Sequence, residues 1–128
     1  MQFNKIAGTL ACLSLALGAH YAFAGIQGNA CLGKLCSSFN AGGGFITVTV
    51  EDLSRVEWDN VSISVQQCDS NGLNCATPQT QRVGTVAGGQ KVSRRFSAPP
   101  THVYFITING TFNGQPTPIP YPGFLVQP

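Results

Sequence analysis

Two stretches of this chain decide its fold: FITVTV at residues 45–50 and VSISVQ at residues 61–66. In both, apolar residues, mostly β-branched, alternate with threonine or serine, so an extended strand would have one apolar face and one polar face. A helix would need apolar residues three and four positions apart, and no convincing run of that kind follows the N-terminal segment. The two stretches therefore predict half-buried strands in an all-β domain.

Two more strands are expected in the middle of the chain. Residues 82–87 and 91–96 have strand-like compositions and flank Gly88-Gly89. Paired glycines favour a tight turn, so the three segments predict a β-hairpin. The charged segment 52–60 fits either one helical turn or a loop.

A further strand is expected at residues 102–108, which are β-branched and aromatic. Asn109-Gly110 follows it and predicts a hairpin turn, with residues 111–112 beginning the return strand. Five or six short strands with no helices between them predict a small antiparallel β-sandwich, or a partly open barrel. The residues expected to fill its core are Ile46, Val48, Val50, Val61, Ile63, Val65, Val86, Phe105, Ile106 and Phe112.

The N-terminus predicts export. Residues 1–24 combine a positively charged start, an apolar run over residues 6–19 and an Ala-x-Ala sequence at residues 22–24, the pattern of a cleaved signal peptide. A membrane anchor needs about 20 apolar residues, and this run stops at His20-Tyr21. We therefore expect a secreted, extracellular protein, periplasmic in a bacterium. Its mature part, residues 25–128, is expected to be one β-sandwich domain without a membrane segment.

The cysteines predict two disulfides. Cys12 would leave with the signal peptide, and the even set that remains in an exported chain indicates disulfide pairing. The turn-forming loop between Cys68 and Cys75 favours their pairing, which leaves Cys31 to pair with Cys36. The crossed pairings would close longer loops and stay open as alternatives. A zinc site fits less well, because the spacing between Cys68 and Cys75 exceeds that of usual zinc ligand pairs. No metal or cofactor is expected.

The Pro-rich C-terminal segment, residues 115–128, has prolines at every second position from 116 to 122. Proline has no N–H and cannot donate to a β-ladder, so the segment is expected to be extended and to lie at a sheet edge. There it would block edge-to-edge aggregation before residues 123–126 dock as a last strand. The alternative is a preformed strip that binds an aromatic groove.

Composition argues against several classes of protein. Hydrophobic residues make up 43% and charged residues only 9%, which is unlike a disordered chain. A net charge of +2 is too small for a dedicated nucleic-acid binder. The mature part has one histidine, His102, and no Gly-x-Ser-x-Gly motif, which argues against a serine hydrolase. Its five acids all lie within residues 51–69, too few to favour a glycosidase. We therefore expect a non-enzymatic protein.

Taken together, the signal peptide, a mature part of about 100 residues, four cysteines and the β-rich pattern resemble a known class. They resemble the small secreted cysteine-containing proteins that plant-associated fungi release as effectors or elicitors. The resemblance implies a virulence protein that binds a host or other extracellular protein, and we expect it to be a monomer. One alternative is a carbohydrate-binding module for cell-wall polysaccharide, and another is an inhibitor of a secreted hydrolase.

Exposed aromatic side chains and arginines are typical anchors of binding surfaces. In the carbohydrate alternative, aromatic rings would stack on sugars and polar neighbours would bind the hydroxyls. The candidate contact residues are Trp58, Tyr104, Tyr121, Arg94 and Arg95.

Two sequences match the N-glycosylation acceptor pattern Asn-x-Ser/Thr. They begin at Asn60 and Asn109. Both asparagines are expected at turns, where a glycan could be attached.

Overall fold

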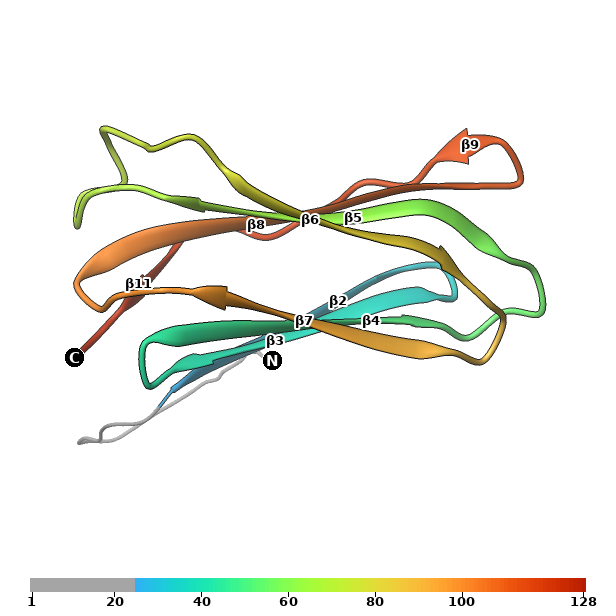
Figure 1. The fold of residues 1–128 in the computed structure, drawn as a ribbon, viewed down its shortest axis with the longest axis horizontal. Coiled ribbons are helices and arrows are strands. Elements are labelled where there is room, and N and C mark those ends of the chain that lie inside the picture. Colours follow the sequence, from blue (N-terminus) through green and yellow to red (C-terminus); the bar gives the residue numbers. More distant parts are fainter. Residues whose placement is uncertain (1–24) are drawn as a thin grey trace.

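Two antiparallel sheets packed face to face form residues 25–128 of the computed structural model, the part of the chain that the structure describes (Figure 1). The predicted all-β sandwich is confirmed. The predicted signal peptide, residues 1–24, lies outside the described residues. Within residues 25–128 no helix is long and apolar enough to cross a membrane.

The four-stranded sheet has the order β2-β3-β4-β7 and the six-stranded sheet has the order β10-β8-β5-β6, with β9 and β11 also paired to β8. The first sheet consists of β2 (Ile26–Leu32), β3 (Leu35–Gly42), β4 (Phe45–Asp52) and β7 (Lys91–Ser97). The second consists of β5 (Trp58–Gln67), β6 (Gln79–Val86), β8 (His102–Phe112), β9 (Gln115–Pro116), β10 (Ile119–Pro120) and β11 (Phe124–Val126).

The core lies between the two sheets and is built from the alternation that predicted them. The apolar residues of the predicted strands 45–50 and 61–66 are buried at Ile46, Val48 and Val50, and at Val61, Ile63 and Val65. Full burial of such side chains stabilises a fold by about 1.5–3 kcal/mol each. The charged segment 52–60 contains no helical turn: residues 53–57 form a loop, and its two ends belong to β4 and β5.

Strand β8 faces the core with a different set of residues from the one expected. Tyr104, Ile106 and Ile108 are fully buried, so Phe105 must point to the opposite side of the sheet. Phe105 is only half-buried, and the prediction that it belongs to the core is wrong. Phe112 is also half-buried, packed against the border of the core.

The predicted turn at Asn109-Gly110 is wrong, because both residues lie inside β8. The chain reverses four residues later, at Asn113 (φ 52°) and Gly114 (φ 75°). Two successive positive φ angles are required by the tight turn that suits a β-hairpin, and Asn-Gly supplies them. Gly110 has another role: a Cβ there would lie 2.6 Å from Nε1 of Trp58. Because Gly110 has only a hydrogen in place of a side chain, the Trp58 indole can pack against its backbone.

The predicted hairpin around Gly88-Gly89 is also wrong. Strands β6 and β7 both exist, but β6 pairs with β5 and β7 pairs with β4, so this connection crosses from one sheet to the other. The two strands meet at the side of the sandwich through side chains. Gln79 Nε2 donates to the carbonyl of Ser97 (3.2 Å), and Gln81 Nε2 donates to the carbonyl of Arg95 (2.7 Å).

Both predicted disulfides are confirmed. Cys31 and Cys36 are direct cross-strand partners on β2 and β3, next to the turn that joins these strands. Cys68 and Cys75 close the loop that follows β5. Neither β2 nor β3 was expected from the sequence, because their alternating residues are mostly glycine, alanine, serine and asparagine rather than branched apolar residues.

The proline-rich segment runs along β8 as an interrupted edge strand, which confirms the prediction that it lies at an edge. The N–H groups of Thr117 and Tyr121 donate to the carbonyls of Gly110 (3.0 Å) and Ile106 (2.9 Å). Thr117, Ile119 and Tyr121 point inward and are buried, whereas the prolines between them are exposed. In a strand, successive N–H groups point to opposite sides. The prolines therefore occupy the positions whose N–H groups would point away from β8, and the residues between them donate to β8. An incoming strand would find no N–H donors along residues 116–122.

Candidate functional site

The aromatic residues predicted as exposed anchors are buried, and that prediction is wrong. Trp58 and Tyr104 are each 0% exposed, and Tyr121 is 8% exposed. Their polar atoms have partners inside the protein. Trp58 Nε1 donates to Thr117 Oγ1 (2.8 Å), and the Tyr104 hydroxyl donates to the carbonyl of Pro99 (2.6 Å). The Tyr121 hydroxyl bonds to Ser37 Oγ at 2.5 Å. In this fold none of the three rings can stack on a ligand.

A β-bulge turns Trp58 into the core. Strict alternation from Val61 would place Trp58 on the outer face of β5. Asn60 instead adopts φ 51°, and the register with β6 and β8 shifts between Trp58 and Val61. The extra residue reverses the alternation, so Trp58 and Val61 face the same way.

The buried tyrosines make the stability of the protein sensitive to alkali. Burial raises the pKa of Tyr121 to about 12, a rise that its hydrogen bond with Ser37 partly opposes, and burial also raises the pKa of Tyr104. A tyrosine in the unfolded chain ionises near pH 10. The folded state therefore holds these protons more tightly, and this stabilisation is complete below about pH 10 and is lost as the pH rises to about 12.

We expect the melting temperature to fall between about pH 10 and pH 12, with Tyr121 contributing a loss of about 2–3 kcal/mol. Thermal unfolding followed by circular dichroism across this range measures the fall. Tyr121→Phe should make it shallower, since phenylalanine cannot ionise. An equally steep fall in that variant would contradict the assignment.

The two candidate arginines lie on opposite faces of β7. Arg95 is exposed on the outer face of the four-stranded sheet. Arg94 is half-buried and shares the inner side with Val92 and Phe96, and its Nη1 donates to the carbonyl of Ser93 (3.0 Å). The structure therefore does not bring the five predicted contact residues together, and of the five only Arg95 lies on an open surface.

Both candidate glycosylation sites are exposed on the outer side of the six-stranded sheet. Asn60 lies at the bulge of β5, and Asn109 lies within β8 opposite Ser62. The prediction that both asparagines lie at turns is wrong, because Asn60 lies within β5 and Asn109 within β8. Attachment of a glycan stays a prediction.

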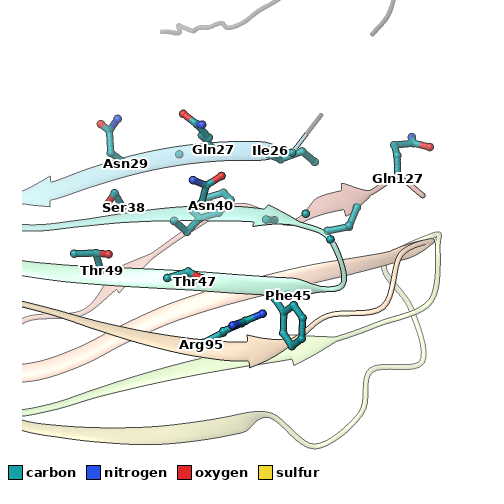
Figure 2. Close-up of a pocket in the computed structure, with 17 residues that line it drawn as sticks. Ile26, Gln27, Asn29, Ser38, Asn40, Phe45, Thr47, Thr49, Arg95 and Gln127 are labelled. Carbon is teal, nitrogen blue, oxygen red and sulfur yellow. The ribbon is translucent and has the colours of Figure 1, made fainter. Parts of the chain in front are cut away.

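The outer face of the four-stranded sheet carries a regular array of polar side chains that sequence reasoning did not find. The outward positions of β2, β3, β4 and β7 fall opposite one another in two adjacent rows across the strands. Figure 2 shows side chains of both rows standing on the same side of the sheet. One row is Asn29, Ser38, Thr49 and Ser93, the other is Gln27, Asn40, Thr47 and Arg95, and these eight residues form what we term the polar face.

A shallow groove of about 1220 Å³ runs over part of the polar face (Figure 2). Its lining combines amide and hydroxyl side chains of both rows with glycines and apolar residues such as Ile26 and Val126. Phe45, which is 41% exposed, stands at one end (Figure 2). The guanidinium carbon of Arg95 lies 3.7 Å from the centroid of the Phe45 ring. A cation held over an aromatic face in this way is attracted by the ring. Part of the polar face could be inferred from the sequence. Thr47 and Thr49 alternate with the apolar core residues of the same strand, so they had to face away from the core.

The loop closed by Cys68 and Cys75 is a second ordered surface feature. Asp69 Oδ1 accepts the N–H groups of Asn71 and Leu73 (both 2.9 Å), and its Oδ2 accepts the side-chain amide of Asn74 (2.8 Å). The bond from Leu73 and then that from Asn74 do most to lower the pKa of the Asp69 carboxyl. These bonds fix the loop and leave the Leu73 side chain 63% exposed.

Among residues 25–128, no group of three or more His, Cys, Asp or Glu side chains is arranged to hold a metal ion. Comparison with known proteins gave no match to a family model, to a curated protein or to a solved structure.

Proposed function

We propose that this protein is a secreted, non-catalytic binding protein that recognises a polysaccharide chain on its polar face. The observation that carries the proposal is the double row of amide and hydroxyl side chains over the groove. It moves the site of the carbohydrate alternative away from the buried Trp58 and Tyr121.

The chemistry of the polar face suits a hydroxyl-rich polymer. Asparagine and glutamine each offer two donors and an acceptor, and serine and threonine each donate and accept, so together they match sugar hydroxyls of either role. Neighbouring side chains in a row are about 4.8 Å apart, and the two rows are about 6.8 Å apart. A flat array of this kind suits an extended chain with repeated hydroxyls better than a compact ligand.

The proposed location is consistent with this ligand. The predicted signal peptide and the two disulfides fit an oxidising compartment outside the cytosol. Structural polysaccharides of cell walls are found there.

Co-sedimentation of the purified, oxidised protein with chitin, cellulose, xylan and β-glucan tests the proposal. We expect retention on at least one polymer, and we expect Asn40→Ala combined with Thr47→Ala to weaken it about tenfold, through the loss of two hydrogen-bonding groups. The matched control is Ser64→Ala with Thr80→Ala, a hydroxyl pair (2.8 Å) on the outer face of the other sheet. Retention on none of the polymers, or equal losses in both variants, would refute the site.

A second candidate function is recognition of a host or other extracellular protein, as an effector or as an inhibitor of a secreted hydrolase. The rigid Cys68–Cys75 loop with exposed Leu73 supports it, since a fixed loop that presents an apolar side chain loses little entropy on binding. A 1:1 complex with a purified extracellular partner should be weakened strongly by Leu73→Ser and should be unaffected by the Asn40 and Thr47 substitutions.

A further inference from the structure

We infer that the polysaccharide recognised by the polar face carries carboxylate groups, as a polyuronate does, and that Arg95 binds them. This inference rests on the proposed function and specifies its ligand. It starts from the one charged side chain of the polar face.

The surroundings of the Arg95 side chain leave its guanidinium able to bind an anion. The guanidinium carbon lies 3.7 Å from the centroid of the Phe45 ring, and this cation–π contact restrains the guanidinium with its N–H groups at the end of the polar face. Within residues 25–128 these N–H groups have no hydrogen-bond acceptor, since the bond from Gln81 uses only the Arg95 backbone carbonyl. A planar group with free edge donors is suited to bidentate binding of a carboxylate.

No acidic side chain on the polar face competes for Arg95. Its cross-strand partner is Thr47, which is followed in the same row by Asn40 and Gln27. The nearest acid on this side of the sheet is Glu51, two rows from Arg95, and its own cross-strand partner is Lys91. In the part of the chain that the structure describes, Arg95 is therefore a charge without an acidic partner at one end of an otherwise neutral row.

The arrangement assigns different parts of a uronate chain to different residues. A carboxylate would bind the Arg95 guanidinium, and hydroxyls of the chain would bind Thr47, Asn40 and Gln27 as the chain crosses the strands. A neutral glycan would use the hydroxyl contacts alone. It would leave the Arg95 donors to water.

The test compares polygalacturonate with its methyl ester, which keeps the chain and removes the charge. The affinity of the purified protein for each form is measured by calorimetry at fixed salt. We expect the ionised form to bind at least about tenfold more tightly. Arg95→Gln should abolish this preference. Arg94→Gln is the matched control, because it removes the same charge from the adjacent residue on the opposite face, and it should leave the preference intact.

Three outcomes would overturn the inference. If the protein binds both forms equally and binds neutral glycans through Asn40 and Thr47, the ligand is neutral, and the proposed function stands without the inference. If Arg94→Gln and Arg95→Gln weaken binding equally, or if polyglutamate binds as well as polygalacturonate, the protein acts only as a weak ion exchanger. If no glycan binds at all, the proposed function fails as well. Melting temperatures of both variants confirm that they are folded.

Discussion

Replacing Trp58 with alanine will lower the free energy of unfolding by about 3–5 kcal/mol. The indole is fully buried between the sheets, beside its strand partners Val86 and Phe112. Its removal leaves a cavity and deprives the buried Thr117 hydroxyl of its donor. Urea denaturation followed by circular dichroism measures the loss, since the chain has only one tryptophan and the variant loses that fluorescence signal.

Phe105→Ala is the matched control for this prediction. Phe105 is a large aromatic residue of the adjacent strand β8, but it is half-buried and faces outward. We expect a loss of about 1 kcal/mol there. A loss of that size or less for Trp58→Ala would place the indole at the surface and would return it to the set of possible ligand contacts.

Removing both disulfides will destabilise the protein by about 4–5 kcal/mol in total. Each bridge closes a short loop, with sequence separations of 5 and 7. The chain-entropy estimate for such loops is roughly 2–2.5 kcal/mol each. A small domain is stable by only about 5–15 kcal/mol, so the protein lacking both bridges should be close to unfolding.

Single-bridge variants separate the two contributions. Cys31→Ala with Cys36→Ala, and Cys68→Ala with Cys75→Ala, should each lose about half of the total, as measured by urea denaturation under oxidising conditions. The sum should reproduce the loss in the protein without either bridge, because one bridge lies within the β2–β3 hairpin and the other in the loop after β5, with no shared residues. A total loss below about 1 kcal/mol would show that the unfolded chain gains little freedom when the loops open.

The fold class was predictable because two strands carry the alternation in its plainest form. Ile46, Val48, Val50, Val61, Ile63 and Val65 are all fully buried, as the pattern indicated. The disulfide pairing was predictable for a separate reason. The loop between Cys68 and Cys75 is rich in turn-forming residues that bring its ends together, and the pairing of Cys31 with Cys36 follows by elimination.

The orientation of the aromatic residues was partly available from the sequence. On β8, the order Ile106, Thr107, Ile108 already fixes the inward positions, and Tyr104 belongs to the same set. Choosing Phe105 for the core and Tyr104 for the surface reverses that alternation. The inward orientation of Trp58 could not be predicted in this way, because the bulge at Asn60 reverses the alternation and a bulge has no reliable sequence pattern.

The polar face could not be predicted because it depends on pairing between distant segments. Half of its residues lie on β2 and β3, whose small polar side chains gave no strand signal. The rest come from β4 and β7, which are neighbours in the sheet although about 40 residues of sequence separate them. The glycine pair Gly88-Gly89 instead predicted that β7 would pair with β6, which would have placed β7 away from β4.

Neither disulfide joins one sheet to the other: the first lies within the β2–β3 hairpin and the second within the loop after β5. A pulling force applied between residues 25 and 126 would therefore meet no covalent link across the sandwich. Once the sheets part, nearly the whole chain is free to extend, at about 3.4 Å per residue. Only the few residues inside the two loops stay shielded from the tension. Under mechanical load, resistance must come from the hydrogen-bonded strands and the buried side chains.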